Sequence, residues 1–403
     1  MIENVRIERR SLMLALGLGV GASLSAGRAM GQALAGRGPV LPSPVFPATP
    51  DTVRIATRTG LRPVRTGGYL LEAATVGSKS VIHNYGHGGA GITMSWGCAE
   101  EVARLAGAFR ATLPSLDVAV LGGGVMGMTA AMLLIEQGFR VTLYSADFTP
   151  DTTSDVAGGQ WAPSVVEFTD AARHQRMLQA AFSRFTGYGR RYGVSRRDNY
   201  SHFRSEDLDH ATAASGLGFE RLDLLPFQRI YSGGYRYPTL LVEPPIFLRR
   251  LHADLRERGA LFVRRRLNSA SELEQMVEPL VVNCLGLGAR EVWSDRNLSG
   301  RKGVLAMLPP QQNLRYLYSG IGYMFPRQDH LVVGGSLEAE NEIDTSLTDV
   351  DKARLILKIV RAVFQGAIPA PNWISGSRRL RGADMIRSAE QPAPATSSAS
   401  APD

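Results

Sequence analysis

A glycine-rich turn between a predicted strand and a predicted helix constrains the fold of this chain more than any other sequence feature. The apolar run 118–121 leads into this turn, an apolar helical segment follows at 128–137, and a second predicted strand follows at 140–144. The turn fits the pattern G-x-G-x-x-G with Gly122, Gly124 and Gly127. These glycines permit a tight turn, close approach of the backbone to a pyrophosphate, and close packing of helix on strand. We therefore predict a dinucleotide site at the helix N-terminus, with contacts from Val125 and Met126 and with Asp147 placed to reach a ribose hydroxyl.

The composition is that of an ordinary globular protein. The chain has 403 residues, of which 44% are hydrophobic and 20% charged, enough for two domains or one large intertwined unit. The formal net charge of +8 comes mainly from scattered arginines without a long basic run, so we expect solvated helix faces and no nucleic-acid partner. The two cysteines, Cys98 and Cys284, lie in apolar surroundings and are expected to be buried thiols. No metal site is predicted.

The first 35 residues predict a secretory signal. Arg9-Arg10 precedes a short apolar run at 12–24, and a small-residue cleavage pattern stands at Ala33-Leu34-Ala35. The run is too short to span a membrane, and the twin arginine is typical of Tat signals, which export folded proteins. We expect a periplasmic protein delivered by the Tat machinery; an uncleaved N-terminal anchor is the alternative. Residues 36–50 are rich in proline and predict an extended linker.

The segment 58–65, R-T-G-L-R-P-V-R, predicts a turn that presents Arg62. Pro63 biases Arg62 away from helical geometry, so its guanidinium would project from extended backbone. In that position an arginine can clamp a carboxylate through two hydrogen bonds. A surface salt-bridge arginine is the alternative.

A second glycine-rich loop follows the predicted strand Ser80–Asn84 and precedes a predicted helix, Ser95–Phe109. Such a loop brings backbone N–H groups and a helix dipole to an anionic or electron-accepting ligand. Together with the first loop it indicates a ligand larger than a pyrophosphate, with an electron-poor end such as a flavin ring. The loop residues predicted to contact this ligand are Gly86, His87, Gly88, Gly89, Gly91, Ile92 and Thr93.

These two loops, the segment around Arg62 and the segment 149–163 resemble the motifs of the D-amino-acid oxidase family of flavoproteins. The order of the motifs differs, because the H-N-Y-G-H-G-G loop stands near the C-terminus in the family and precedes the Rossmann strand here. The chain therefore resembles a circularly permuted member, with the joint at 106–116. The resemblance implies FAD as cofactor. It also implies an α/β fold in which a Rossmann-type FAD-binding domain is intertwined with an antiparallel-sheet α+β substrate domain.

The predicted domain boundaries follow from these motifs. Residues 51–165 and 246–300 form the FAD-binding domain, with 51–113 supplying the second glycine loop. Residues 166–245 and 301–387 form the substrate domain. The spacing of apolar residues at 349–365 predicts an amphipathic helix, and residues 388–403, rich in Pro, Ala and Ser, predict a disordered tail.

The resemblance also implies contacts to the flavin from the segment that follows the first dinucleotide unit. In the family this segment runs beside the flavin ring and its N5 atom. The residues concerned are Thr152, Thr153, Ser154, Gly158, Gly159 and Gln160. Two positions depart from the family: an apolar residue usually stands at Gln160, and the ribose aspartate aligns with Ala146, one residue before Asp147.

The segment 315–335 predicts an antiparallel hairpin with aromatic residues at its mouth. Alignment with the family places Tyr323 at the tyrosine that assists the arginine in holding the substrate carboxylate. The family's other active-site tyrosine falls at Ser319, with Tyr318 beside it. Because a slip of one residue reverses a strand side chain, Tyr318 enters the site in only one of two registers. Core or interface tyrosines are the alternative for both.

The implied reaction is oxidative deamination of a D-amino acid to a 2-oxo acid, ammonia and hydrogen peroxide, with hydride passing to flavin N5. Arg62 would clamp the carboxylate, Tyr323 would donate a second hydrogen bond, and the Gly89 carbonyl would accept from the amine. Oxygen is the expected electron acceptor, and a homodimer is compatible with the sequence. Three alternatives stay open: an oxidase of glycine or another amine, a dehydrogenase that uses another acceptor, and an inactive flavin-binding protein.

Overall fold

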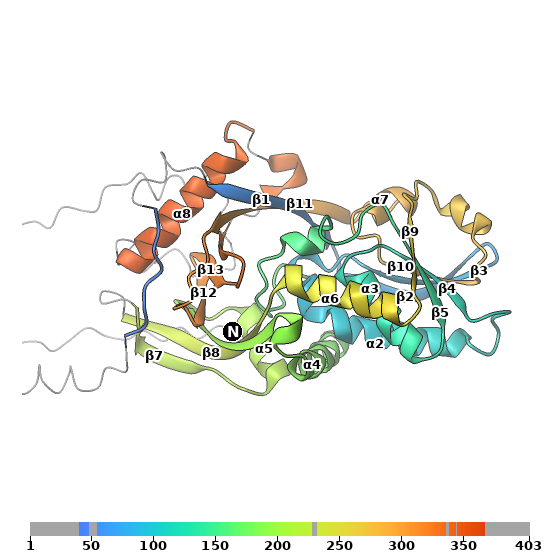
Figure 1. Cartoon of the computed structure of the whole chain (residues 1–403), viewed down its shortest axis with the longest axis horizontal. Coiled ribbons are helices and arrows are strands. Elements are labelled where there is room, and N and C mark those ends of the chain that lie inside the picture. The colour runs from blue at the N-terminus through green and yellow to red at the C-terminus, as the bar shows by residue number, and fades with distance from the viewer. Residues whose placement is uncertain (1–39, 48–54, 228–231, 336–337, 344, 367–403) are drawn as a thin grey trace, which may run out of the picture. The chain divides into compact units, whose positions relative to one another are not determined.

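The computed structural model describes residues 40–47, 55–227, 232–335, 338–343 and 345–366 (Figure 1). The chain divides into two units, residues 1–41 and 42–403, and all helices and strands of the described residues belong to the second. The predicted signal at 1–35 and the predicted tail at 388–403 lie outside the described residues.

A six-stranded sheet, called the parallel sheet below, carries the first glycine-rich turn. In spatial order its strands are β2 (Leu70–Val76), β3 (Lys79–Tyr85), β10 (Leu280–Asn283), β4 (Asp117–Leu121), β5 (Arg140–Ser145) and β9 (Leu261–Arg264). All neighbours pair in parallel except β2 and β3. β4 and β10 are almost entirely buried, as expected for strands covered on both faces.

Helices pack on the parallel sheet and on one another. Helix α2 (Gly91–Phe109) packs against α3 (Val125–Glu136) and α4 (Ala171–Gly187), and α3 also contacts α6 (Pro244–Glu257) (Figure 1). Their apolar faces form the largest hydrophobic core of the protein, which includes the fully buried Trp96.

A nine-stranded sheet, called the antiparallel sheet below, contains the other strands of the described residues. Its spatial order is β1 (Ala56–Arg65), β11 (Leu298–Leu308), β14 (Leu331–Gly334), β13 (Gly322–Pro326), β12 (Tyr316–Gly320), β6 (Val194–Ser201), β8 (Ser232–Val242) and β7 (Glu220–Leu224), with β15 (Glu338–Ala339) also on β11. Only β6 and β12 pair in parallel. Helix α8 (Asp349–Gln365) packs against β1, β11, β13 and β14 (Figure 1).

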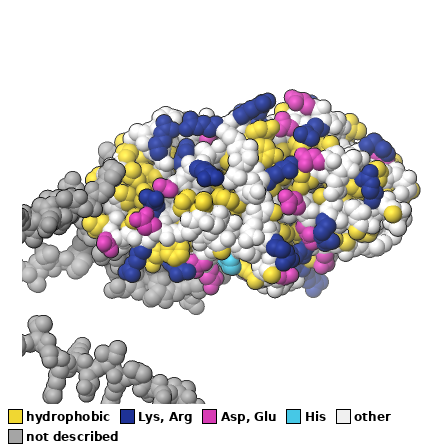
Figure 2. Space-filling model, turned by 90° about the horizontal axis from the view of Figure 1, so that it is seen from below, with side chains coloured by type: hydrophobic (Ala, Val, Ile, Leu, Met, Phe, Trp, Pro, Cys, Tyr) yellow, Lys and Arg dark blue, Asp and Glu magenta, His cyan; other side chains and the backbone are white. Residues whose placement is uncertain are grey.

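Short elements complete the described part of the chain. The α-helices are α5 (Glu206–Ser215) and α7 (Gly288–Val292), and the 3-10 helices are η1 (Gly88–Ala90), η2 (Thr153–Val156), η3 (Arg190–Tyr192), η4 (Ala270–Gln275) and η5 (Glu340–Glu342). No helix among the described residues is long and apolar enough to cross a membrane. On the face seen in Figure 2, basic side chains are interspersed with acidic ones.

Most predicted elements are confirmed with small shifts at their ends. Helix α8 has the predicted bounds, and α2 begins at Gly91, four residues earlier than the predicted Ser95. The two cysteines are buried and free, as predicted.

The predicted turn at 58–65 is wrong. These residues lie in β1, which pairs with β11 along its whole length. Pro63 is tolerated because β1 is the edge strand of the antiparallel sheet, where one row of backbone groups has no ladder partner. Arg62 therefore stands on extended backbone, as predicted, but within a strand.

The segment 51–113 contributes to both sheets. Its strand β1 pairs in the antiparallel sheet, although the predicted boundaries give it to the FAD-binding domain, and its strands β2 and β3 lie in the parallel sheet. From the predicted linker, the described residues 42–47 contain no helix or strand, and the Tyr316 hydroxyl donates to the Pro42 carbonyl at 2.8 Å.

Candidate cofactor and substrate site

A cavity of about 930 Å³ is lined by both glycine-rich loops and by strands of both sheets. The parallel pairing of β3 and β4 with the central β10 explains why the loops meet. The carboxyl ends of parallel strands lie at one edge of a sheet, so the residues after β3, β10 and β4 converge there. The converging loops are 86–91, 284–288 and 122–126, and every residue of these ranges except Ala90 lines the cavity.

The first glycine loop has the backbone geometry that the pattern requires. Gly122 has a φ of 115°, and a Cβ there would lie 2.3 Å from the Cys284 carbonyl oxygen. A Cβ at Gly127 would lie 1.9 Å from the Gly122 carbonyl oxygen. Gly127 therefore packs the helix against the turn, the role that the pattern predicts for its third glycine, and it does not line the cavity.

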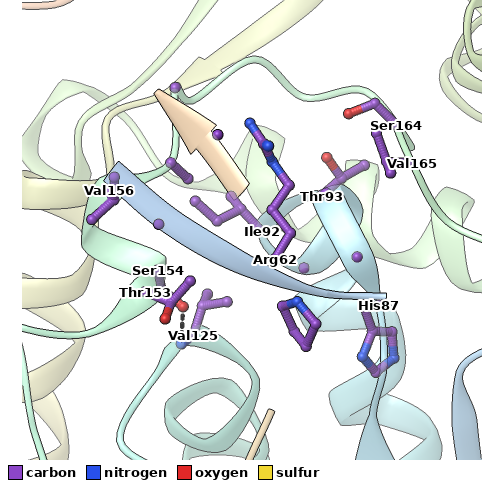
Figure 3. Close-up of a pocket in the computed structure, with 18 of the residues that line it drawn as sticks. Arg62, His87, Ile92, Thr93, Val125, Thr153, Ser154, Val156, Ser164 and Val165 are labelled. Carbon is purple, nitrogen blue, oxygen red and sulfur yellow. Dashed lines mark hydrogen bonds between the residues drawn. The ribbon is translucent and has the colours of Figure 1, made fainter. Parts of the chain in front are cut away.

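The N-terminus of α3 faces the cavity and is fixed by the segment before it. The Val125 backbone N–H donates to Ser154 Oγ at 3.0 Å (Figure 3). Ser154 lies in η2, which a reciprocal cap between Thr152 and Asp155 closes. Helix N-termini of this kind bind phosphate groups, so this end of the cavity fits a pyrophosphate.

The end of the cavity near β5 and β9 is rich in charge. Asp147 lines it, but more than half of its side chain is exposed and it forms an ion pair with Arg264 at 3.3 Å. Its contact with a ribose therefore stays a prediction. Sequence reasoning missed Arg265 and Arg266, which also line this end. Both arginines directly follow β9, which pairs in parallel with β5, so they reach the edge of the parallel sheet where Asp147 lies.

The second glycine loop is packed closely against the segment after Trp161. A Cβ at Gly88 would lie 1.9 Å from the Val165 carbonyl oxygen, and one at Gly89 would lie 2.6 Å from that of Ser164. The loop therefore tolerates only glycine at both positions. Its His87 is 2% exposed, and burial lowers the pKa of His87 to about 3, so the imidazole is neutral.

Arg62 extends from β1 into the cavity (Figure 3). Its guanidinium lies over Gly303 of the neighbouring strand, where a Cβ would be 2.3 Å from Nη1. The Nη1 atom is buried and has no hydrogen-bond partner within the described residues. Leaving a buried donor unpaired is costly, so this nitrogen fits an anionic ligand such as a carboxylate.

Tyr323 lies on the same face of the antiparallel sheet. It is the cross-strand partner of both Ser319 and Gly334, and a Cβ at Gly334 would lie 2.4 Å from the Tyr323 hydroxyl. The missing side chains at Gly303 and Gly334 leave room for Arg62 and Tyr323 to approach the same region. Both residues line the cavity.

The structure does not bring Tyr318 into the cavity, which corrects that prediction. Its side chain is fully buried, its ring packs against Phe364 of α8, and its hydroxyl accepts from the Ile321 N–H at 3.2 Å. Side chains alternate along a strand, so Ser319 in the cavity puts Tyr318 on the opposite face.

The other predicted contacts line the cavity. They are Gly86, His87, Gly88, Gly89, Gly91, Ile92, Thr93, Gly122, Gly124, Val125, Met126, Asp147, Thr152, Thr153, Ser154, Gly158, Gly159 and Gln160. Sequence reasoning missed Tyr237 and the segment from Phe203 to Leu208, which also line it. No motif marks these residues, because they reach the cavity only through the pairing of β6 and β8.

The family model described as "FAD dependent oxidoreductase" matches residues 43–105 and 117–392. D-aspartate oxidase of Homo sapiens is 27% identical over 232 residues, which cover 54% of this chain and 68% of that protein. D-amino-acid oxidase of Streptomyces coelicolor is 28% identical over 243 residues, covering 56% and 71%. Among solved structures, glycine oxidase of Geobacillus kaustophilus superposes with a TM-score of 0.47 at 16% identity, covering 62% of this chain and 79% of that one.

Proposed function

Because the chain belongs to the FAD dependent oxidoreductase family, we propose that it oxidises D-amino acids to 2-oxo acids, ammonia and hydrogen peroxide. The observation that carries this proposal is the buried, unpartnered Nη1 of Arg62 beside Tyr323 in the cavity. The curated relatives named D-aspartate oxidase and D-amino-acid oxidase support the choice of substrate class.

FAD is the cofactor of this family, and the residues of the cavity fit it. The α3 N-terminus offers a pyrophosphate site, and the second glycine loop lines the same cavity with Gly86, Gly88 and Gly89. A bound FAD would supply a two-electron acceptor for the substrate hydride, and oxygen, reduced to hydrogen peroxide, would be the final oxidant.

The protein's own contribution is to bind and orient the substrate. Arg62 binds the carboxylate through its guanidinium, of which Nη1 is buried, and the Tyr323 hydroxyl donates a second hydrogen bond to it. The Gly89 carbonyl accepts from the neutral amine and so fixes the direction of the Cα–H bond. Orientation of this kind supplies most of the rate acceleration when no acid or base has to act on Cα.

The test is the variant Arg62→Ala. We expect it to lower kcat/KM for D-amino acids by at least about 1,000-fold, because the loss of a charge-assisted bidentate contact both weakens binding and misorients the substrate. The visible flavin spectrum should be unchanged. Arg58→Ala, an exposed arginine on the same strand, is the matched control and should leave both unchanged. Equal kinetics for the Arg62 variant and the wild type would remove Arg62 from the substrate site.

Oxygen is the proposed electron acceptor. Oxygen uptake with release of hydrogen peroxide at the rate of D-amino-acid consumption supports an oxidase. Turnover that occurs only with an added dye acceptor would instead make the protein a dehydrogenase.

We also propose that residues 1–35 direct export to the periplasm by the Tat route. Replacing Arg9-Arg10 with Lys-Lys should retain the protein in the cytoplasmic fraction of a bacterial host. Unchanged recovery in the periplasmic fraction would contradict Tat export.

A further inference from the structure

A hydrogen-bonded group of four polar side chains, called the polar group below, joins the wall of the cavity next to Tyr323. Asn199 Nδ2 donates to Ser319 Oγ at 2.8 Å, and Gln160 Nε2 donates to the Tyr237 hydroxyl at 2.9 Å. Ser319 and Tyr237 hydrogen-bond to each other and so connect the two pairs. Three of the four residues line the cavity, and Asn199 lies behind them, fully buried.

Strand register places the polar group beside the proposed carboxylate site. Ser319 is the direct cross-strand partner of Tyr323, so their Cβ atoms lie about 5 Å apart on one face of the sheet. Tyr237 is in turn the cross-strand partner of Asn199. Arg62 lies on the other side of Tyr323, over Gly303. A bound amino acid with its carboxylate at Arg62 and Tyr323 can therefore extend its side chain toward Ser319, Tyr237 and Gln160.

The polar group has hydrogen-bonding capacity left over for a ligand. Ser319 and Tyr237 carry two hydroxyl hydrogens but share one hydrogen bond, and both outer residues approach them as donors. One hydroxyl hydrogen is thus unused in the hydrogen bonds of the described residues. Gln160, at the cavity, also has a carbonyl oxygen beyond its bond to Tyr237. The wall therefore offers a donor and an acceptor.

We propose that Gln160, Tyr237 and Ser319, positioned by Asn199, bind the substrate side chain and select a neutral carboxamide. This inference rests on the proposed function, because it takes the carboxylate position from Arg62. A carboxamide both donates and accepts, whereas a carboxylate only accepts and an alkyl group does neither. An alkyl group would also leave the buried hydroxyl hydrogen unpaired. The favoured substrates are D-asparagine and D-glutamine.

The first experiment compares D-asparagine, D-aspartate and D-leucine, whose side chains have nearly the same shape. For the wild type with FAD we expect kcat/KM for D-asparagine to exceed the other two by at least about tenfold, the usual worth of one or two neutral hydrogen bonds. Tyr237→Phe and Gln160→Leu should each remove most of this preference, chiefly through KM for D-asparagine. Tyr200→Phe, on the neighbouring strand and the opposite face, is the matched control and should preserve the preference.

A second readout does not depend on turnover. Succinamate, succinate and 4-methylpentanoate carry the same three side chains without the amine and cannot be oxidised at Cα–N. In calorimetric titration of the FAD-loaded protein, succinamate should bind most tightly, and Tyr237→Phe should weaken it about tenfold while leaving 4-methylpentanoate unchanged.

The outcomes separate the two proposals. D-amino-acid oxidation with D-leucine or D-aspartate preferred would overturn the carboxamide pocket and leave the proposed function intact. An equal loss of kcat/KM for all three substrates in the Tyr237→Phe variant would also overturn the carboxamide pocket, since it would indicate a structural role for Tyr237. If no D-amino acid is oxidised, the proposed function fails, and the pocket then stands or falls on the titration series.

Discussion

At the residue scale, the beginning of α3 depends on Gly127, a glycine that does not line the cavity. A Cβ at Gly127 would lie 1.9 Å from a backbone oxygen, so Gly127→Ala should lower the free energy of unfolding by about 3 kcal/mol or more and weaken FAD binding. Gly107→Ala is the control, because a Cβ there meets nothing within 4 Å; removing a helical glycine should stabilise by about 0.5–1 kcal/mol. Urea unfolding of the two variants checks both signs. Similar stability of the two would contradict the packing role of Gly127.

His87 should make stability depend on pH. Burial, and then its neighbour His174, lowers the pKa of His87 from 6.5 to about 3. Below pH 6.5 the imidazole of His87 takes up a proton in the unfolded chain but not in the folded protein. The contribution of His87 to the free energy of unfolding is therefore fully present above pH 6.5 and is lost as the pH falls toward 3. Between pH 7 and pH 5 we expect a loss of about 2 kcal/mol from this residue.

The measurement is urea unfolding of the wild type and His87→Gln at both pH values. The glutamine stays neutral in the folded and the unfolded state. Between pH 7 and pH 5 the free energy of unfolding of the variant should therefore fall by about 2 kcal/mol less than that of the wild type. Equal losses would show that His87 is not protonated on unfolding in this range.

Residues with a local signal could be predicted, and those placed by long-range pairing could not. Arg62 and Tyr323 were found because each stands in a distinctive motif, and both line the cavity. The register of Tyr318 stayed open in the sequence, because a tyrosine beside a strand position carries no sign of which face of the sheet it occupies. Tyr237 was missed because its approach to Gln160 spans 77 residues of sequence.

At the element scale, helix α8 is joined to the strand before it by a buried ion pair. Lys352 Nζ donates to Glu338 Oε2 at 3.0 Å, and the two side chains are 6% and 8% exposed. Lys352→Met should lower the free energy of unfolding by about 3–5 kcal/mol, because it leaves the Glu338 carboxylate buried without this cation. The double variant with Glu338→Leu should regain most of that loss.

A surface pair provides the comparison for this prediction. Arg104→Met breaks the exposed Arg104–Glu101 pair and should cost less than about 1 kcal/mol in the same urea unfolding assay. If Lys352→Met costs no more than Arg104→Met, the buried pair does not hold α8 in place.

Elements were predictable to the extent that their own sequence specifies them. Helix α8 has an apolar face at helical spacing and an N-terminal cap between Thr348 and Asp351, and its predicted bounds are confirmed. Strand β1 contains a glycine and a proline, which favour a turn locally. Pairing with β11 overrides that preference, and nothing in 58–65 itself indicates the partner.

At the scale of the whole molecule, the site is assembled by contacts that do not depend on the order of the chain. Strand β3 joins β10, β1 joins β11, and α2 packs on α3 and α4, so segment 51–113 is held through its surfaces. The connection after α2 is exposed at residues 110–112 and 114. This arrangement supports the prediction that the chain is a circular permutation whose joint lies between α2 and β4.

The prediction is tested by restoring the other order. A chain of residues 115–366, a Gly/Ser linker of about 15 residues and residues 42–113 cuts the joint and reconnects the segment after α8, which already packs on β1. We expect it to bind FAD with the same visible spectrum and to unfold within about 2 kcal/mol of the parent, because changed loop lengths cost little. Residues 115–366 alone should not fold, since they lack β1, β3 and α2. A rearranged chain that is colourless and unfolded would mean that the connection from α2 to β4 is required for folding, and the permutation would then be no more than a resemblance of motifs.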